Sequence, residues 1–504
     1  MSEAGPTPAA RRGKPILVRL ASATAARDVR RWIWLLTGVG LFAAIALWPS
    51  PPIAVDPNGE VVALGREAQW ALALFALAAT WWVFEVVPIG VTAIAIGVAQ
   101  ALFLIREPRV AWTDYFDPSV WFIFGSIVIG LVFTRTGLTR RLAYGMLMAV
   151  GEKTRNIYLG AFLMTAGLTL VMAHTAVAAA LFPVLMAIHH LYGSGDEKTR
   201  FGAGLFVGMA FTAGAGSVIT LFGAARSAVG IGFFRELAGR DVDFFELSYY
   251  MAPLGAVMVL ILWLYILVVF PPERSVIPGL RDRARALYEK LGPMTRREFG
   301  AVLIVTAAVL LMSLKQFVPA LAGIDKSAII LSATVLFFVF RILKADDLEG
   351  VSWNIILLFG GAMSIGFCLW QTGAAKWLAI HWLGLLATAP PLAFITGVAV
   401  FVMIMTNLIM NVAAIAISLP VALTIAPYMG VAPEPILYAS LAAAGMPFLF
   451  LVGAAPNAIA YNSEQFTTGR FFVAGVPASV ILVGVIALFV WKIWPWMGMP
   501  VFIR

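Results

Sequence analysis

The sequence contains little charge, few histidines and almost no cysteine. Only 12% of its 504 residues are charged and 61% are hydrophobic, whereas soluble proteins carry about 25% charged residues. Cys368 is the single cysteine, which excludes an intramolecular disulfide and a cysteine-rich metal site. With four histidines and few acids inside apolar segments, no convergent set of catalytic residues is apparent. These absences exclude a soluble protein and argue against an enzyme.

Apolar segments long enough to cross a bilayer recur along almost the whole chain. A spanning helix needs roughly 20 mostly apolar residues. We therefore expect an all-α polytopic membrane protein with about eleven transmembrane helices. The expected crossings lie near residues 32–49, 67–84, 86–104, 118–134, 202–234, 247–270, 299–316, 327–343, 352–371, 435–463 and 473–494.

The basic residues cluster in a few connecting segments, where they predict topology. The tail 1–31 is basic, the linker 271–298 carries seven Lys and Arg, and the segment 235–246 has four acids against two arginines. Because Lys and Arg favour the cytoplasmic side, we place the tail and the linker in the cytoplasm and the C-terminus outside. This orientation predicts a multi-pass protein of the plasma (inner) membrane. It also explains the net charge of +9 without a nucleic-acid partner.

Two further apolar stretches, 157–191 and 388–429, must each enter and leave on the same side if the charge bias is to hold. No Asp, Glu, Lys or Arg lies between Lys376 and Glu434. Prolines such as Pro420 nevertheless interrupt the helical pattern there. Both stretches are therefore predicted to be re-entrant hairpins.

An internal repeat relates the two halves, 32–270 and 299–504. The matched pairs are Phe122–Ala143 with Leu357–Ala379, Ala173–Val184 with Met410–Val421, and GAARSAV (Gly223–Val229) with GAAPNAI (Gly453–Ile459). Each half thus contains a hairpin followed by a broken helix, at 202–234 and 435–463. Counting the crossings places the start of the first repeat outside and the start of the second inside, so we expect inverted repeats.

Such an arrangement indicates a transporter. Unwound backbone at membrane depth is tolerated only where protein or a water-filled cavity satisfies its amides and carbonyls. Two breaks that face two hairpin tips would enclose such a cavity, where half-helix ends offer N–H groups to anions and carbonyls to small cations. We therefore predict a secondary transporter with its site at the repeat interface.

The motif WWVFEVVPIGVTA (Trp81–Ala93) and LFGG (Leu358–Gly361) resemble those of the divalent anion/sodium symporters, which carry di- and tricarboxylates or sulfate. The resemblance covers nearly the whole chain from Trp81. It implies that tip and break form a sodium site in each half, with the anion held between the tips. It also implies a homodimer in which the hairpins and broken helices move as an elevator.

The family's tips carry Ser-Asn-Thr and its breaks Gly-Thr-Pro-Pro-Asn, and this chain keeps those motifs only in part. On the matching positions we expect the substrate at His174, Thr175, Arg226, Ser227, Asn411 and Pro456. A cation is expected at Gly223, Asn411, Gly453 and Asn457, with a possible Na⁺ at the second site and no other metal or cofactor.

Arg226 occupies the position of Pro456 in the partner loop, and two interpretations are open. It could snorkel to the interface or pair with a carboxylate, as arginines near helix ends commonly do. Alternatively, a bound anion offsets its charge, which costs roughly 2.5 to 3.5 kcal/mol at mid-bilayer. No acid lies nearby in the sequence, which favours the anion.

His174 is expected to face Arg226 if the tip and break of one half meet. It could be a neutral histidine inside the helix bundle, a proton carrier or a donor to the anion. We rank the donor above the proton carrier, because a nearby guanidinium disfavours a second positive charge.

The sequence therefore predicts a secondary active transporter of small divalent organic anions, such as C4 dicarboxylates or 2-oxoglutarate. Arg226 and His174 would replace the first sodium ion and favour anion exchange. The alternatives are a sodium- or proton-coupled symporter, including one for sulfate or sulfonates, and more distantly an anion channel.

Overall fold

The computed structural model describes most of the chain. Its backbone is described for residues 16–49, 51–55, 61–84, 86–193, 197–315, 317–321, 323–351, 353–386, 389–408 and 410–503, and its side chains for the same residues except 16–30, 83, 379, 382–386 and 452. The basic residues Arg11, Arg12 and Lys14 of the predicted tail lie outside the described residues.

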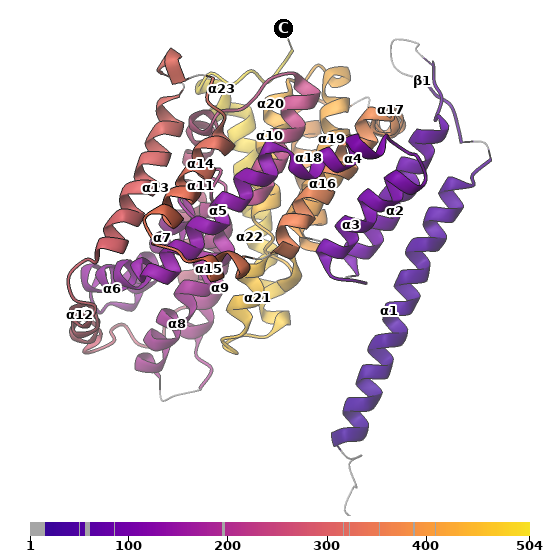
Figure 1. The fold of residues 1–504 in the computed structure, drawn as a ribbon. Helices are drawn as coiled ribbons and strands as arrows, with labels where there is room; N and C mark the ends of the chain where they lie inside the picture. The colour runs from indigo at the N-terminus through magenta and orange to yellow at the C-terminus, as the bar shows by residue number, and fades with distance from the viewer. Residues whose placement is uncertain are drawn as a thin grey trace, which may run out of the picture.

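The structure is helical almost throughout, as the composition predicts (Figure 1). The first half and the linker form α1 (Ile16–Ala46), α2 (Arg66–Val83), α3 (Ile89–Leu102), α4 (Pro108–Thr113), α5 (Pro118–Thr136), α6 (Leu138–Val150), α7 (Thr154–Thr169), α8 (His174–Tyr192), α9 (Arg200–Ser217), α10 (Ala225–Ala238), α11 (Phe244–Val269) and α12 (Leu280–Lys290).

The second half forms α13 (Arg296–Leu314), α14 (Lys326–Val339), α15 (Ala345–Glu349), α16 (Trp353–Gln371), α17 (Ala374–Leu386), α18 (Pro391–Leu408), α19 (Asn411–Ile425), α20 (Pro433–Gly445), α21 (Ala455–Tyr461), α22 (Thr468–Leu488), the π-helical turn η5 (Phe489–Ile493) and α23 (Trp494–Trp496). Short 3-10 turns are η1 (Asp114–Phe116), η2 (Pro319–Leu321), η3 (Ala426–Met429) and η4 (Leu451–Gly453). Two strands, β1 (Ala54–Val55) and β2 (Val61–Val62), pair antiparallel after α1.

Eight helices in the described part of the chain are long and apolar enough to cross a membrane. They include α8, α18 and α19, which are arms of the predicted hairpins, while α3 and α14 are shorter apolar helices. Length and composition therefore establish a multi-pass helical membrane protein but do not separate a full crossing from a re-entrant arm.

Helix α1 begins sixteen residues earlier than the crossing predicted at 32–49. Its first part, from Ile16 to Arg31, contains neither Pro nor Gly, so nothing in it interrupts the helix. In Figure 1 the lower part of α1 extends beyond the body of the protein. Much of the predicted tail is thus a continuation of the first helix.

Several matched positions of the predicted repeat have the same backbone conformation. Gly137 separates α5 from α6 with φ of 86°, and its counterpart Gly373 separates α16 from α17 with φ of 80°. These left-handed conformations favour glycine and allow each long helix to end beside a second short one. Pro183 and Pro420 lie at matching places inside α8 and α19.

The two broken helices run in opposite directions. In Figure 1, α10 lies above α9, whereas α21 lies below α20. Ala224 and Ala454 precede the second segments in the same extended conformation, with φ of −160° and −152°. Each break thus ends in an extended residue, after which the chain restarts a helix.

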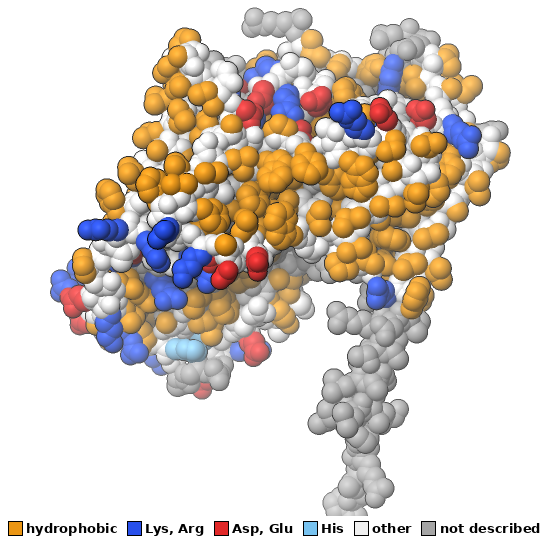
Figure 2. Space-filling view, viewed as in Figure 1, with side chains coloured by type: hydrophobic (Ala, Val, Ile, Leu, Met, Phe, Trp, Pro, Cys, Tyr) orange, Lys and Arg blue, Asp and Glu red, His pale blue; other side chains and the backbone are white. Residues whose placement is uncertain are grey.

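The broken helix that contains α9 lies at the centre of the protein, whereas helices such as α13 lie at its edge. Every residue of α9 from Phe201 to Ser217 is buried. By contrast, α13 exposes large apolar side chains, among them Phe299, Leu303 and Leu310. Figure 2 shows a broad apolar band with charged side chains gathered above and below it, as expected for a protein surrounded by lipid.

Candidate functional site

The first hairpin tip is hydrogen-bonded to the first break through His174. This residue begins α8, and both its backbone N and its ring Nδ1 lie 3.0 Å from the carbonyl oxygen of Gly223. Because a carbonyl only accepts hydrogen bonds, Nδ1 must carry the proton. The neutral ring then presents Nε2 as an acceptor.

The backbone of the first break, residues 218–224, is held by side chains of neighbouring elements. The Thr220 hydroxyl donates to the carbonyl of Leu170 at 2.9 Å, and the Ser126 hydroxyl donates to that of Phe222 at 3.0 Å. A Cβ at Gly223 would lie 2.6 Å from the Cα and the carbonyl oxygen of Ser217. The break therefore requires glycine at this position.

Arg226 is fully buried at the second residue of α10. Its Nη2 donates to the Ser217 hydroxyl at 2.8 Å and its Nε to the Leu441 carbonyl at 3.4 Å. No ion pair among the described residues involves Arg226, and its Nη1 has no hydrogen-bond partner there. In this conformation the side chain neither snorkels nor pairs with a carboxylate.

The guanidinium hydrogen-bonds toward α20, and the hydrogen bonds of His174 go to Gly223 rather than to Arg226. The expected meeting of tip and break is therefore present, but it is made by the backbone of Gly223. The sequence could not indicate this direction, because Leu441 lies 215 residues from Arg226 in the chain.

The second break, residues 446–454, is held by asparagines. Asn457 donates from Nδ2 to the carbonyls of Pro447 at 2.8 Å and Phe450 at 3.1 Å. Asn407 accepts from the backbone N–H of Leu449 at 2.7 Å. These amides satisfy backbone groups that the interrupted helix leaves free, so in this conformation the Asn457 amide supports the loop.

The remaining predicted residues lie at the ends of the same helices. Asn411 begins α19 and is 7% exposed, while Thr175 is half-buried beside His174. Ser227 is buried and its hydroxyl has no partner among the described residues, whereas Pro456 is buried in the first turn of α21.

The two repeats are packed across one another. The arm α8 of the first hairpin contacts α21 of the second repeat, and the arm α19 of the second hairpin contacts α10 of the first. Both hairpins thus lie against the restarted segment of the opposite broken helix. The helices that carry the predicted site residues thus meet across the two repeats, although no described hydrogen bond joins the two tips.

Sequence reasoning missed Ser217 and Gly445, which surround the Arg226 guanidinium. A Cβ at Gly445 would lie 2.5 Å from Nη2 and 3.0 Å from Cζ of Arg226. The only signal in the sequence is that each follows a run of small residues, Gly214–Gly216 and Ala442–Ala444, directly before a break.

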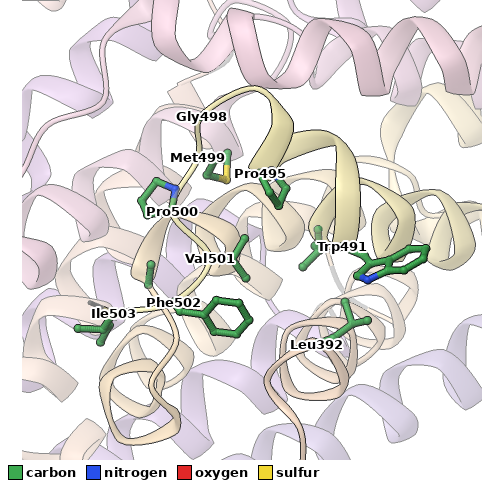
Figure 3. Close-up of a pocket in the computed structure, with 11 residues that line it drawn as sticks. Leu392, Trp491, Pro495, Gly498, Met499, Pro500, Val501, Phe502 and Ile503 are labelled. Carbon is green, nitrogen blue, oxygen red and sulfur yellow. The ribbon is translucent and has the colours of Figure 1, made fainter.

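A separate cavity of about 1090 Å³ lies beside the C-terminal turn (Figure 3). It is lined by residues such as Leu392, Trp491 and Phe502, and none of its lining residues carries an ionisable side chain. This cavity lacks the charge that an anion site needs and lies outside the repeat interface.

Comparison with known proteins supports this architecture. The family model described as the sodium:sulfate symporter transmembrane region matches residues 31–500. The chain belongs to this family. It is therefore a membrane transport protein and not an enzyme.

Curated relatives are dicarboxylate transporters, and solved structures of other transporters share the fold. The sodium-dependent dicarboxylate transporter SdcS from Staphylococcus saprophyticus is 22% identical over 478 residues, which cover 91% of each chain. SdcS from Staphylococcus aureus is 24% identical over 450 residues, which cover 85% of this chain and 86% of that protein. The Alcanivorax borkumensis YdaH transporter and Neisseria gonorrhoeae MtrF each superpose with a TM-score of 0.56 at 13% identity. The YdaH match covers 93% of this chain and 98% of that one, and the MtrF match 91% and 94%. At this identity the two structures show a shared fold alone.

Proposed function

We propose that this protein is a secondary active transporter of small divalent organic anions, with dicarboxylates as the first candidates. The observation that carries the proposal is the fully buried Arg226, which lies at one of two matched helix breaks and has no carboxylate partner among the residues that the structure describes. The dicarboxylate transporters among its relatives support the substrate class. The anion would bind between the tips, near His174 and Asn411, with Thr175, Ser227 and Pro456 around it.

The fixed charge of Arg226 has a consequence for coupling. A sodium ion can leave with its substrate, whereas a tethered guanidinium cannot. The empty carrier would then have to move an uncompensated charge through hydrocarbon, which is costly. We therefore expect obligatory anion exchange. The second site, near Asn411, Gly453 and Asn457, is the one place left for a sodium ion in this scheme, because Arg226 replaces the ion expected at Gly223, and exchange does not require it.

The opposed broken helices support the expected topology of about eleven crossings, two re-entrant hairpins and inverted repeats. In that topology the N-terminus is cytoplasmic and the C-terminus outside, in the plasma membrane. We further propose a homodimer in which the hairpins and broken helices move together as an elevator.

Transport by purified protein in proteoliposomes tests the proposal. Dicarboxylate uptake should require an anion on the opposite side and proceed without sodium. Flux should saturate and show counterflow, which separates a carrier from a channel. Strict sodium dependence without any counter-substrate would refute exchange.

The variant R226P tests whether Arg226 supplies the positive charge that binds the anion. Proline is compatible with this place, because Pro456 occupies it in the partner repeat and the first N–H groups of a helix have no partner within it. Anion binding by R226P should disappear or become sodium-dependent. Unchanged sodium-independent transport would show that Arg226 has no part in it.

The geometry of His174 favours one second candidate, proton-coupled transport. With its Nδ1 proton donated to Gly223, the neutral ring can donate to an anion only after Nε2 gains a proton. In that case anion binding should take up a proton and weaken as the pH rises.

The variant H174N tests this candidate, because the asparagine amide can keep the hydrogen bond to Gly223 while Nε2 is lost. Binding should be measured with sulfate, which stays doubly charged near neutral pH. If protons are coupled, the wild type shows a pH dependence that H174N lacks. A wild-type affinity independent of pH would leave fixed-charge exchange as the mechanism.

A further inference from the structure

The Arg226 guanidinium lies where two half-helices from different repeats end. Helix α9 ends at Ser217, whose hydroxyl accepts from Nη2 at 2.8 Å. Helix α20 ends at Gly445, and its Leu441 carbonyl, four residues earlier, accepts from Nε at 3.4 Å. One side chain from the start of α10 therefore touches the C-terminal ends of both broken helices.

Electrostatics explains why a cation is stable at this point. The C-terminal end of a helix carries a partial charge of about −0.5, so two such ends together present about one negative charge. A guanidinium supplies one positive charge and can donate in several directions within its plane. The partial charges of the α9 and α20 ends thus stabilise a guanidinium that no carboxylate in the described structure neutralises, while its full formal charge remains because a helix dipole adds no net charge.

The guanidinium fits against the end of α20 because Gly445 has no side chain. A Cβ at Gly445 would lie 2.5 Å from Nη2 of Arg226 and 2.4 Å from Cγ1 of Val218. Any larger residue at the end of α20 would therefore displace the guanidinium. The Ser217 hydroxyl donates to the carbonyl of Gly214 at 2.7 Å, which directs its lone pairs toward Nη2.

From this geometry we propose that Arg226 is a built-in counter-ion shared by both helix breaks, with Ser217 and Gly445 as its positioning residues. This inference rests on the proposed function in one respect, namely that the breaks form the transport site. It goes further because one guanidinium serves both repeats, so neither break needs a mobile sodium ion. Removing the side chain should leave a site for a guanidinium ion.

Thermal unfolding of purified protein without any transported anion tests the proposal. R226A should unfold several degrees below the wild type, and guanidinium chloride, at concentrations far below those that denature proteins, should restore it in a saturable way. Tetramethylammonium chloride should not, and neither salt should raise the wild-type midpoint. If Arg226 is only an anion ligand, R226A without anion will be as stable as the wild type or more so, which overturns the proposal.

The positioning residues have a matched control. G445A should lower the midpoint, and guanidinium should not restore it because the arginine is still present. S440A removes a buried hydroxyl on the same helix that has no partner in the described structure, and its midpoint should match the wild type. A G445A protein as stable as S440A would contradict the positioning role.

A second pair of variants keeps the test decisive if R226A does not yield folded protein. R226K and R226Q have similar side-chain lengths and differ in charge. Without anion, R226K must unfold at the higher temperature, and equal or reversed midpoints overturn the shared counter-ion. These measurements involve no transport, so their failure is distinct from a wild type that carries no dicarboxylate.

Discussion

At the residue scale, each break contains a tightly enclosed glycine, Gly223 in the first and Gly453 in the second. An added Cβ would lie 2.6 Å from the Ser217 backbone at Gly223, and 2.8 Å from the Thr406 carbonyl oxygen at Gly453. Backbone atoms cannot move away as a flexible side chain can. The Gly223 carbonyl also accepts both hydrogen bonds of His174, so a shift there would loosen the first tip.

We expect G223A to lower the stability of the protein by about 1 to 3 kcal/mol, the usual cost of overpacking, and to weaken anion binding as well. The measurement is thermal unfolding in detergent together with anion titration. G167A in α7 is the control, because an added Cβ there meets nothing within 4 Å. Equal midpoints for the two variants would show that the break tolerates a side chain.

At the scale of elements, the start of α9 is fixed by the linker between the halves. Glu273 accepts hydrogen bonds from the backbone N–H groups of Arg200 and, at 3.1 Å, Phe201, and from the Tyr192 hydroxyl at 3.0 Å. Thr199 accepts from the N–H of Gly202 at 2.8 Å. The first N–H groups of the central broken helix are therefore satisfied outside the membrane-spanning segments.

These contacts predict a pH dependence of stability. Burial would raise the pKa of Glu273, but the N–H groups of Arg200 and Phe201 and the Tyr192 hydroxyl outweigh it and hold the pKa below the usual 4.5. A depressed pKa stabilises the fold above the unfolded value of about 4.5 and loses that effect as the pH falls through the folded value. E273Q should therefore lower the unfolding midpoint at neutral pH and lose its difference from the wild type in acid. E289Q, at an exposed position of α12, should match the wild type at every pH.

The positions of the elements could be predicted from the sequence, whereas their partners could not. Apolar runs, Gly137 with Gly373, and the paired motifs at Gly223 and Gly453 locate the helices and both breaks to within a few residues. The crossing at the end of α1 was predicted, but its helical continuation before Arg31 was not, because that part is too polar to count as a crossing. The direction of the Arg226 side chain depends on α20, and no local pattern encodes a contact 215 residues away.

At the scale of the whole molecule, ion pairs join the connection between α10 and α11 to the helices around it. Arg235 pairs with Asp117 at 2.9 Å, and Lys326 pairs with Asp241 at 2.7 Å. Arg240 bridges Glu246 and Glu434, and this pairing raises the pKa of its guanidinium. The charged residues of the segment 235–246, predicted to lie outside, thus have partners in both halves. The two halves are therefore fixed to each other at this end, and the basic linker lies at the other.

The orientation of the molecule in the membrane can be tested by cysteine labelling, because the folded native chain should react little with thiol reagents. Cys368 is its only cysteine and is fully buried. Arg285 lies in the linker helix α12 and Phe502 near the C-terminus, and both side chains are exposed. If the basic linker is cytoplasmic, a membrane-impermeant maleimide should label F502C in intact cells and R285C only after the membrane is permeabilised. The wild type should label only after denaturation, and labelling of R285C in intact cells would reverse the assigned topology.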